Sequence, residues 1–425
     1  MRVKFITLGC KTNTYESDAM GKLFIDKGYE IAEEGTADIY VINTCTVTGT
    51  GAQKSRQAIG KAIREKADAL IAVTGCLAQT ETEKIKEIPG VDIVIGNSGK
   101  NRIVELVEEA NEKKKQIVFC KDIMEEISFE EIANTAVQSR IRANVKIEDG
   151  CNNYCTYCII PYARGKVRSR DINKIEEEVI ALSKAGYREI VLTGIHIGSY
   201  GKDLKEDISL IDVLEKVCAV EGIERVRLGS LEPVVITEDF VKRAKKLENL
   251  CPHFHMSLQS GCDETLKRMN RHYTAEEYKK AVKLLRDNIP DTSITTDLMV
   301  GFPGETDEEF EKSYEFCKSI GFMQMHIFKY SIRKGTRAEK FPDQISKKVK
   351  EERSKKMLSL AEDMKKAFYE KYEGRETQVL FEVENDGIYH CTTPNYMDIY
   401  VKSEEELSGE IKTVVLDGKC KGKLK

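Results

Sequence analysis

Three cysteines lie within eight positions in the stretch GCNNYCTYC: Cys151, Cys155 and Cys158, in the pattern C-x3-C-x2-C. Thiolates are the usual ligands of iron–sulfur clusters. A structural zinc site needs a fourth Cys or His, and the next candidates, His196 and Cys218, are distant in sequence. A disulfide would leave one cysteine over. The spacing favours a cluster held by three thiolates, with one iron open to a small molecule. Zinc or structural thiols are the alternatives.

Cysteines also end three apolar, strand-like runs near the N-terminus. These runs are RVKFITLGC (2–10), ADIYVINTC (37–45) and ALIAVTGC (69–76), and VDIVIGN (91–97) follows them. Helical stretches between the runs predict a parallel sheet covered on both faces. Since the carboxyl ends of such strands share one edge, where ligands bind, Cys10, Cys45 and Cys76 can converge there. The pattern predicts a second three-thiolate metal site. The alternative is three small buried residues.

The strand–helix alternation resumes from residue 139 to about 335. ANVKIEDG leads into the cysteine loop, and five further strand-like runs follow: REIVLTG (188–194), ERVRLGS (224–230), HFHMSLQ (253–259), SITTDLMVGFP (293–303) and MQMHIFKYS (323–331). Six parallel strands with intervening helices predict a full or partial β/α barrel. Its chemistry sits at the carboxyl ends of the strands, so the cysteine loop belongs on that face.

We therefore expect an α/β protein with four parts. Residues 1–115 form a flavodoxin-like parallel-sheet domain, and residues 116–138, charged and without a clear period, form a linker. Residues 139–370 form the barrel domain and end in one long charged helix (346–371). Residues 371–425 alternate in polarity and carry turn residues, which predicts a small antiparallel β-barrel.

The bulk composition bounds the class of protein. The chain has 425 residues, a net charge of −4 and 13 cysteines. This charge excludes a globally basic nucleic-acid binder, so any RNA-binding surface must be local. No stretch approaches the roughly 18 apolar residues of a membrane span. Without a secretory signal, the cysteines favour metal-bound thiolates in a reducing cytoplasm over a disulfide framework.

The cysteine loop, with Tyr157 before its last cysteine, resembles the signature of the radical S-adenosylmethionine (AdoMet) enzymes. Nearly the whole chain resembles one branch of them, the AdoMet-dependent methylthiotransferases. The tail GIYHCTTPNYMDIYV resembles their RNA-binding barrel, called TRAM. The other matching stretches are GCKTNTYES, VINTCTV, VTGCLAQ, CNNYCTYCIIPYARGKVRSR, SLQSGCDETLKRMNR and DLMVGFPGET.

The resemblance implies two 4Fe–4S clusters. The ligands of the AdoMet cluster are matched by Cys151, Cys155 and Cys158. The ligands of an auxiliary cluster, whose open iron carries the sulfur or methylthio group, are matched by Cys10, Cys45 and Cys76. One AdoMet generates a 5′-deoxyadenosyl radical and another donates methyl, so that a C–H bond becomes C–S–CH3.

The implied substrate depends on the branch. The chain most resembles the bacterial branch that modifies threonylcarbamoyladenosine at tRNA position 37. The stretches that carry this resemblance are GCKTNTYES, CIIPYARGKVRSR and LTGIHIGSYG. The branch acting on isopentenyladenosine typically has Gln-Met after the first Gly-Cys, and a third branch modifies an aspartate of a ribosomal protein; both are alternatives. The implied partners are tRNA, an electron donor such as flavodoxin or ferredoxin, and a sulfur source.

Two readings from other classes remain. A cobalamin-dependent radical enzyme would also place a flavodoxin-like domain before a radical domain. However, the usual cobalamin motif contains His, and the first 195 residues have none. A non-enzymatic iron–sulfur or zinc protein that only binds RNA would not need a six-stranded barrel with a ligand-binding cysteine loop.

Further candidate residues lie at other strand ends. In the family, the positions of Thr193 and Gly194 hold the amino group of AdoMet; Glu232 and Gln259 are candidates for its ribose or carboxylate, or else helix caps. Tyr157 is a candidate to pack near the adenine. The lone His196 is more often a hydrogen-bonded structural residue. Cys120 has no assigned role. The other cysteines are expected to be structural: Cys218, Cys251, Cys262, Cys317, Cys391 and Cys420.

Candidate RNA contacts lie in RGKVRSR, where Arg164, Lys166, Arg168 and Arg170 alternate. On an extended segment they would share one face and bind tRNA phosphates. A solvated, salt-bridged surface is the alternative, and Arg164 can instead serve the pocket. The tail is acidic, with eight Lys or Arg and eleven Asp or Glu in 371–425. Its basic KCKGKLK end and its aromatics predict weak tRNA binding.

Overall fold

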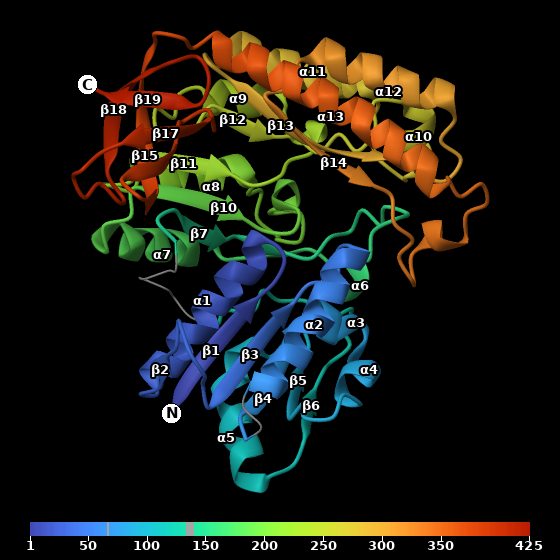
Figure 1. The fold of residues 1–425 in the computed structure, drawn as a ribbon, viewed down its shortest axis with the longest axis vertical. Helices are drawn as coiled ribbons and strands as arrows, with labels where there is room; N and C mark the ends of the chain where they lie inside the picture. Colours follow the sequence, from blue (N-terminus) through green and yellow to red (C-terminus); the bar gives the residue numbers. More distant parts are fainter. Residues whose placement is uncertain (66–67, 133–139) are drawn as a thin grey trace.

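The computed structural model describes residues 1–65, 68–132 and 140–425. It confirms the predicted α/β class: an N-terminal parallel sheet, a partial barrel of parallel strands, and a small closed C-terminal barrel (Figure 1). The C-terminal barrel departs from a purely antiparallel one, because one of its strand pairs is parallel. No helix within the described ranges is long and apolar enough to cross a membrane.

The N-terminal sheet has the strand order β2-β1-β3-β4-β5-β6, and all of its strands are parallel. This is the flavodoxin-like order, extended by one strand. Its strands are β1 (Arg2–Thr7), β2 (Glu30–Ile31), β3 (Ile39–Thr44), β4 (Leu70–Gly75), β5 (Ile93–Ile95) and β6 (Ile117–Phe119). The predicted linker start is wrong, because β6 falls within residues 116–138. Residues 133–139 lie outside the described ranges.

Helices cover both faces of this sheet, which explains its continuous apolar strands. Alternate residues of β3 point to opposite faces: Val41 packs with α1 (Lys11–Asp26) and α5 (Ile103–Lys113), and Ile42 packs on the other side. That side is covered by α2 (Gly49–Glu65), α3 (Cys76–Thr80) and α4 (Thr82–Lys86). Helix α1 also packs against the barrel strand β7, so it lies between the two domains (Figure 1).

The central barrel consists of two three-stranded parallel sheets, joined by a bridge between Leu231 and Met256. Its strands are β7 (Ala143–Lys146), β10 (Glu189–Thr193), β11 (Arg225–Leu228), β12 (His253–His255), β13 (Ser293–Val300) and β14 (Gln324–Lys329). Its helices are α7 (Ile172–Lys184), α8 (Leu210–Cys218), α9 (Glu238–Ala244), α10 (Asp263–Arg268), α11 (Ala275–Asn288) and α12 (Asp307–Ile320). Two short strands, β8 (Glu148–Asp149) and β9 (Arg168–Ser169), and α6 (Ile160–Arg164) frame the cysteine loop.

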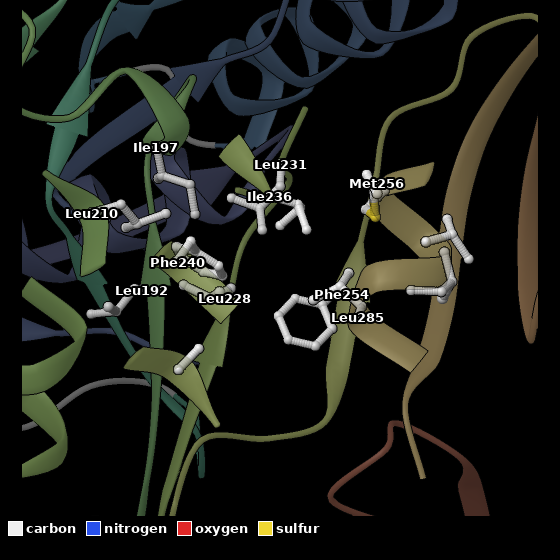
Figure 2. Packing of buried hydrophobic residues seen from close by; sticks show 14 of the residues in the cluster. Leu192, Ile197, Leu210, Leu228, Leu231, Ile236, Phe240, Phe254, Met256 and Leu285 are labelled. Atoms are coloured by element: carbon white, nitrogen blue, oxygen red, sulfur yellow. The ribbon is translucent and has the colours of Figure 1, made fainter. Parts of the chain in front are cut away.

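Strand alternation gives the barrel an apolar outer face and a polar lumen. Leu192, Leu228 and Phe254 point outward and pack against the helices, where Phe240 and Leu285 meet them (Figure 2). The residues between them on the same strands are polar and point the other way. The lumen is therefore lined by groups such as Thr193, His255, Thr295 and His326.

The C-terminal barrel follows the long helix α13 (Lys347–Glu370), which the sequence predicts. Its strands are β15 (Glu376–Asn385), β16 (Ile388–Thr392), β17 (Asp398–Lys402), β18 (Ile411–Leu416) and β19 (Lys421–Leu424). The end of β16 and the loop between β16 and β17 close the amino end of the central barrel. Arg225 donates to the Thr392 carbonyl at 3.0 Å, and Ser293 donates to the Asn395 carbonyl at 2.6 Å.

Candidate active site

The cysteine loop between β8 and α6 brings its three thiols together. It begins at Gly150, whose φ is +89° and where a Cβ would lie 1.9 Å from the Lys166 carbonyl oxygen, so only glycine fits. Burial, with a smaller contribution from the neighbouring thiols of the loop, raises the pKa of Cys151 and of Cys158 to about 12. Arg271 donates to the Cys155 sulfur at 3.3 Å.

The N-terminal cysteines also meet, at the edge predicted for them. Cys10 precedes α1, Cys45 follows β3, and Cys76 begins α3. Burial raises the pKa of Cys45, and the thiols of Cys76 and Cys10 add to the shift. Asn13 ties two of the strand ends together, since its amide donates to the Leu8 carbonyl at 2.7 Å and the Thr44 carbonyl at 3.0 Å. Their binding of a cluster stays a prediction.

The two cysteine groups face each other across the domain interface. Arg164, just after the cysteine loop, donates to the Cys76 sulfur at 3.4 Å. The Cys76 thiol is also one of the groups that raise the pKa of Cys158, after burial and Cys155. On α1, the Thr12 hydroxyl donates to the Gly194 carbonyl at 3.3 Å. The first turn of the helix after Cys10 is thus anchored to the strand end where AdoMet is expected.

The donor set fits iron–sulfur clusters. All six thiols are free. In the described part of the chain, no three His, Cys, Asp or Glu side chains are placed to bind one common metal ion. In a 4Fe–4S cluster each thiolate binds its own iron, so its ligands stand further apart than the ligands of a single ion.

The predicted AdoMet residues surround the same strand ends. Thr193 and Gly194 line a cavity of about 400 Å³ in the barrel lumen. Gln259, half-buried at the end of the strand-like segment after β12, has a φ of +65°, a conformation that non-glycine residues rarely adopt outside functional or strained sites. Tyr157 packs edge-on against the Phe302 ring, with centroids 6.3 Å apart. None of these contacts includes a ligand, so the four roles stay predictions.

Glu232 is held by partners within the protein. Its carboxylate accepts hydrogen bonds from Asn153 at 2.9 Å and lies 2.7 Å from Arg271 and 3.3 Å from His196. Burial alone would raise the pKa of Glu232, but the hydrogen bond to His196 and the charge of Arg271 lower it to about 2. His196 itself contacts Ser199 at 2.5 Å, which agrees with the structural role expected of it.

The prediction of RNA contacts is wrong for the three arginines of RGKVRSR, because Arg164, Arg168 and Arg170 are buried. Arg168 donates to the backbone carbonyls of Arg164 and Lys166, and Arg170 pairs with Glu131 and Glu178. Of the four basic residues, Lys166 is exposed. The alternating charge predicted one shared face, but Arg164 belongs to α6 and only the three arginine side chains turn toward the protein interior.

Arg164 belongs to a buried charge network at the domain interface. The Glu16 carboxylate on α1 accepts from Arg164 at 2.6 Å, Lys100 at 2.6 Å and Lys146 at 2.7 Å. Lys146 and Arg164 also pair with Asp149. Burial alone would raise the pKa of Glu16, but the cations, led by Arg164, hold it well below its usual range. The network joins α1, the end of β7 and the cysteine loop.

Sequence reasoning missed several of these groups. Arg271 touches Cys155 across 116 positions, and Glu16 meets Arg164 across 148. Glu16 lies in GCKTNTYES and Arg271 ends SLQSGCDETLKRMNR, but no spacing along the sequence could have indicated either contact.

A buried acid beside the cysteine loop leads to one prediction. Burial raises the pKa of Glu148 to about 8, against 4.5 as its ordinary value, while the backbone N–H groups of His196 and Ile195 oppose the shift. The folded state thus keeps a proton that the unfolded state releases, so this group's contribution to stability is full below pH 4.5 and declines up to about pH 8. We expect Glu148→Gln to remove that decline, as measured by urea unfolding at several pH values. An unchanged pH profile would contradict the assignment.

The lumen, the two cysteine groups and the parallel strands define a radical AdoMet protein. The family model "Radical SAM superfamily" matches residues 145–317, and "Uncharacterized protein family UPF0004" matches residues 2–96. The chain is 42% identical, over 96% of its length and 92% of the relative's, to the threonylcarbamoyladenosine tRNA methylthiotransferase MtaB of Bacillus subtilis. It is 39% identical, over 89% of its own length and 85% of the relative's, to the tRNA-2-methylthio-N(6)-dimethylallyladenosine synthase of Clostridium tetani. The chain belongs to the radical AdoMet methylthiotransferase family, whose members are enzymes with a 4Fe–4S cluster and AdoMet.

Solved structures share the fold at low identity. The radical AdoMet methyltransferase TsrM of Kitasatospora setae superposes with a TM-score of 0.57 at 14% identity, over 77% of this chain and 72% of that one. A cobalamin-dependent radical enzyme, OxsB, superposes with a TM-score of 0.53 at 13% sequence identity, over 85% of this chain and 56% of that one. At such identities only the fold is shared, and the family relationship rests on the methylthiotransferases.

Proposed function

We propose that this enzyme converts the C2–H of N6-threonylcarbamoyladenosine at tRNA position 37 to C2–S–CH3, with one AdoMet as radical source and another as methyl donor. The observation that carries the proposal is the meeting of two cysteine groups, one of which lines the polar lumen cavity through Cys10. Relatives named for this activity in Bacillus subtilis, Aquifex aeolicus and Thermotoga maritima, at 37–42% identity, support the substrate.

Cys151, Cys155 and Cys158 would hold the AdoMet cluster, and Cys10, Cys45 and Cys76 a second 4Fe–4S cluster. When bound, the first supplies the electron that cleaves AdoMet to a radical, and the second supplies the sulfur. Thr193 and Gly194 bind the amino group of AdoMet, and Gln259 and Glu232 face its ribose or carboxylate. Tyr157 lies beside the adenine.

The RNA-facing groups are the exposed basic ones. Lys166 lies next to the cysteine loop, and Lys421, Lys423 and Lys425 are exposed at alternate positions of the last strand and its end, so they share one face. These lysines are suited to tRNA phosphates. An electron donor such as flavodoxin or ferredoxin, and a sulfur source, complete the partners. A reducing cytoplasm fits the free thiols.

The test is mass spectrometry of digested tRNA from a host lacking its own methylthiotransferases, with and without this enzyme. We expect a methylthio increment on threonylcarbamoyladenosine. An increment on isopentenyladenosine would keep the chemistry and overturn the substrate. No increment on any nucleoside, with the protein loaded with iron, would overturn the tRNA assignment and point to the ribosomal-protein aspartate.

A further inference from the structure

The lumen cavity has a lining suited to a polar group. The Nδ1 of His255 lies 2.9 Å from the Thr295 hydroxyl, and its Nε2 lies 3.4 Å from the Asp297 carboxylate. His326, which also lines the cavity, makes no hydrogen bond within the described chain. The buried Nδ1 of His253 likewise has no partner there. Because buried polar groups are normally hydrogen-bonded, the unpartnered Nδ1 of His253 indicates a ligand with its own polar atoms. His255 and the exposed His326 line the same cavity and can add contacts to it.

Lys11 adds an unpaired cation to the same cavity. It follows Cys10, lines the lumen cavity together with Thr12 and Thr14, and also borders a neighbouring cavity of about 640 Å³. Its side chain is half-buried, yet it forms no ion pair or hydrogen bond with any residue in the described ranges. A lysine withdrawn from water without a partner is costly, so such groups normally meet an anion.

The surroundings of Lys11 are themselves positive. The charged groups with the largest effects on Lys11 are the guanidiniums of Arg140, Arg142 and Arg227 and the carboxylate of Glu189. That carboxylate is already bound by Arg227 at 2.8 Å, so it does not neutralise Lys11. Arg142 also pairs with Glu382 at 3.0 Å, but positive charges still outnumber negative ones around Lys11. The excess of positive charge, next to an auxiliary cysteine and open to the lumen, is suited to a carboxylate.

We propose that Lys11 binds the carboxylate of the threonylcarbamoyl group, and that the imidazoles and hydroxyls of the lumen bind its urea and hydroxyl. This inference rests on the proposed function and names the residue that would set its specificity. An isopentenyl group carries no charge and no hydrogen-bonding atom, so it would leave Lys11 and His326 unpartnered. Lys11 is thus a binding residue that favours an acidic side chain on the nucleotide.

The test uses the full enzyme with both clusters reconstituted and two anticodon stem–loops. One carries threonylcarbamoyladenosine, and the other carries its neutral methyl ester. Because a hydrogen bond to a charged group is worth about 1.5–3 kcal/mol, we expect Lys11→Met to lower kcat/KM for the acid about 10- to 100-fold and to leave kcat/KM for the ester nearly unchanged. Lys11→Arg should keep most of the preference for the acid. Lys27→Met, at the other end of α1, is the matched control and should behave like the wild type.

Each outcome is decisive. Equal losses on acid and ester would overturn the inference, whether Lys11 then binds an RNA phosphate or supports the cluster beside Cys10; iron content and the dissociation constant of each stem–loop would separate these two cases. If the wild-type enzyme does not modify the acid stem–loop, the proposed function fails and the inference fails with it.

Discussion

Cys155→Ala is expected to reduce AdoMet cleavage to background, and Cys45→Ala is expected to spare cleavage while abolishing the methylthio product. Cys155 belongs to the loop that would bind the AdoMet cluster, whereas Cys45 lies with Cys10 and Cys76 on the other domain. Chromatography of 5′-deoxyadenosine and of the modified nucleoside measures the two steps separately. The reconstituted wild type should hold about eight irons per chain, and each variant about four.

A cysteine outside both groups provides the control. Cys218, at the end of α8, is half-buried and away from both groups, so Cys218→Ala should keep both activities and the full iron content. If Cys45→Ala still yields methylthio product, the assignment of the auxiliary site is wrong. If Cys155→Ala still cleaves AdoMet, the assignment of the loop is wrong.

Glu16→Gln should destabilise the enzyme by about 3–5 kcal/mol, because it leaves buried cations without their anion. The carboxylate now pairs with Arg164, Lys100 and Lys146 away from water. Urea unfolding measures the change. Glu30→Gln is the control: its ion pair with Arg2 is exposed and should be worth at most about 1 kcal/mol.

The effect of Glu16 depends on pH in a defined direction. Since the folded state lowers the pKa of Glu16 below its ordinary 4.5, its stabilisation is present above that pH and is lost as the pH falls. The difference between Glu16→Gln and the wild type should therefore shrink in acid. A variant as stable as the wild type at pH 7 would show that the network contributes no net stability.

The apolar runs of the sequence predicted the strands that position the site. They did not predict the contacts between residues that lie far apart in the chain. The strands before Cys10, Cys45 and Cys76 are long apolar runs ending at turns, and the geometry of a parallel sheet then brings their ends together. Strands β2 and β6 have two and three residues, too few for a period to show.

The RNA contacts predicted for the buried arginines are wrong because the sequence does not show which groups these arginines pair with. An alternating basic run looks the same whether its partners are phosphates or carboxylates. The carboxylates that bind Arg164 lie at Glu16 and Asp149, and only the packing of α1 between the domains brings Glu16 there. Lys11 lies within GCKTNTYES, but its lack of a partner in the described ranges is visible only in the folded chain.

The loop between β16 and β17 has a consequence for the order of synthesis. Domains generally fold as units from the N-terminus during translation, and the six cysteines of the two groups all emerge long before residue 392. A nascent chain that ends before Thr392, the last residue of β16, lacks the Thr392 and Asn395 carbonyls that meet Arg225 and Ser293. Its lumen is open at the base. The reaction chamber is therefore completed last. Deleting the C-terminal barrel would remove the floor of this chamber as well as the lysines proposed to bind tRNA.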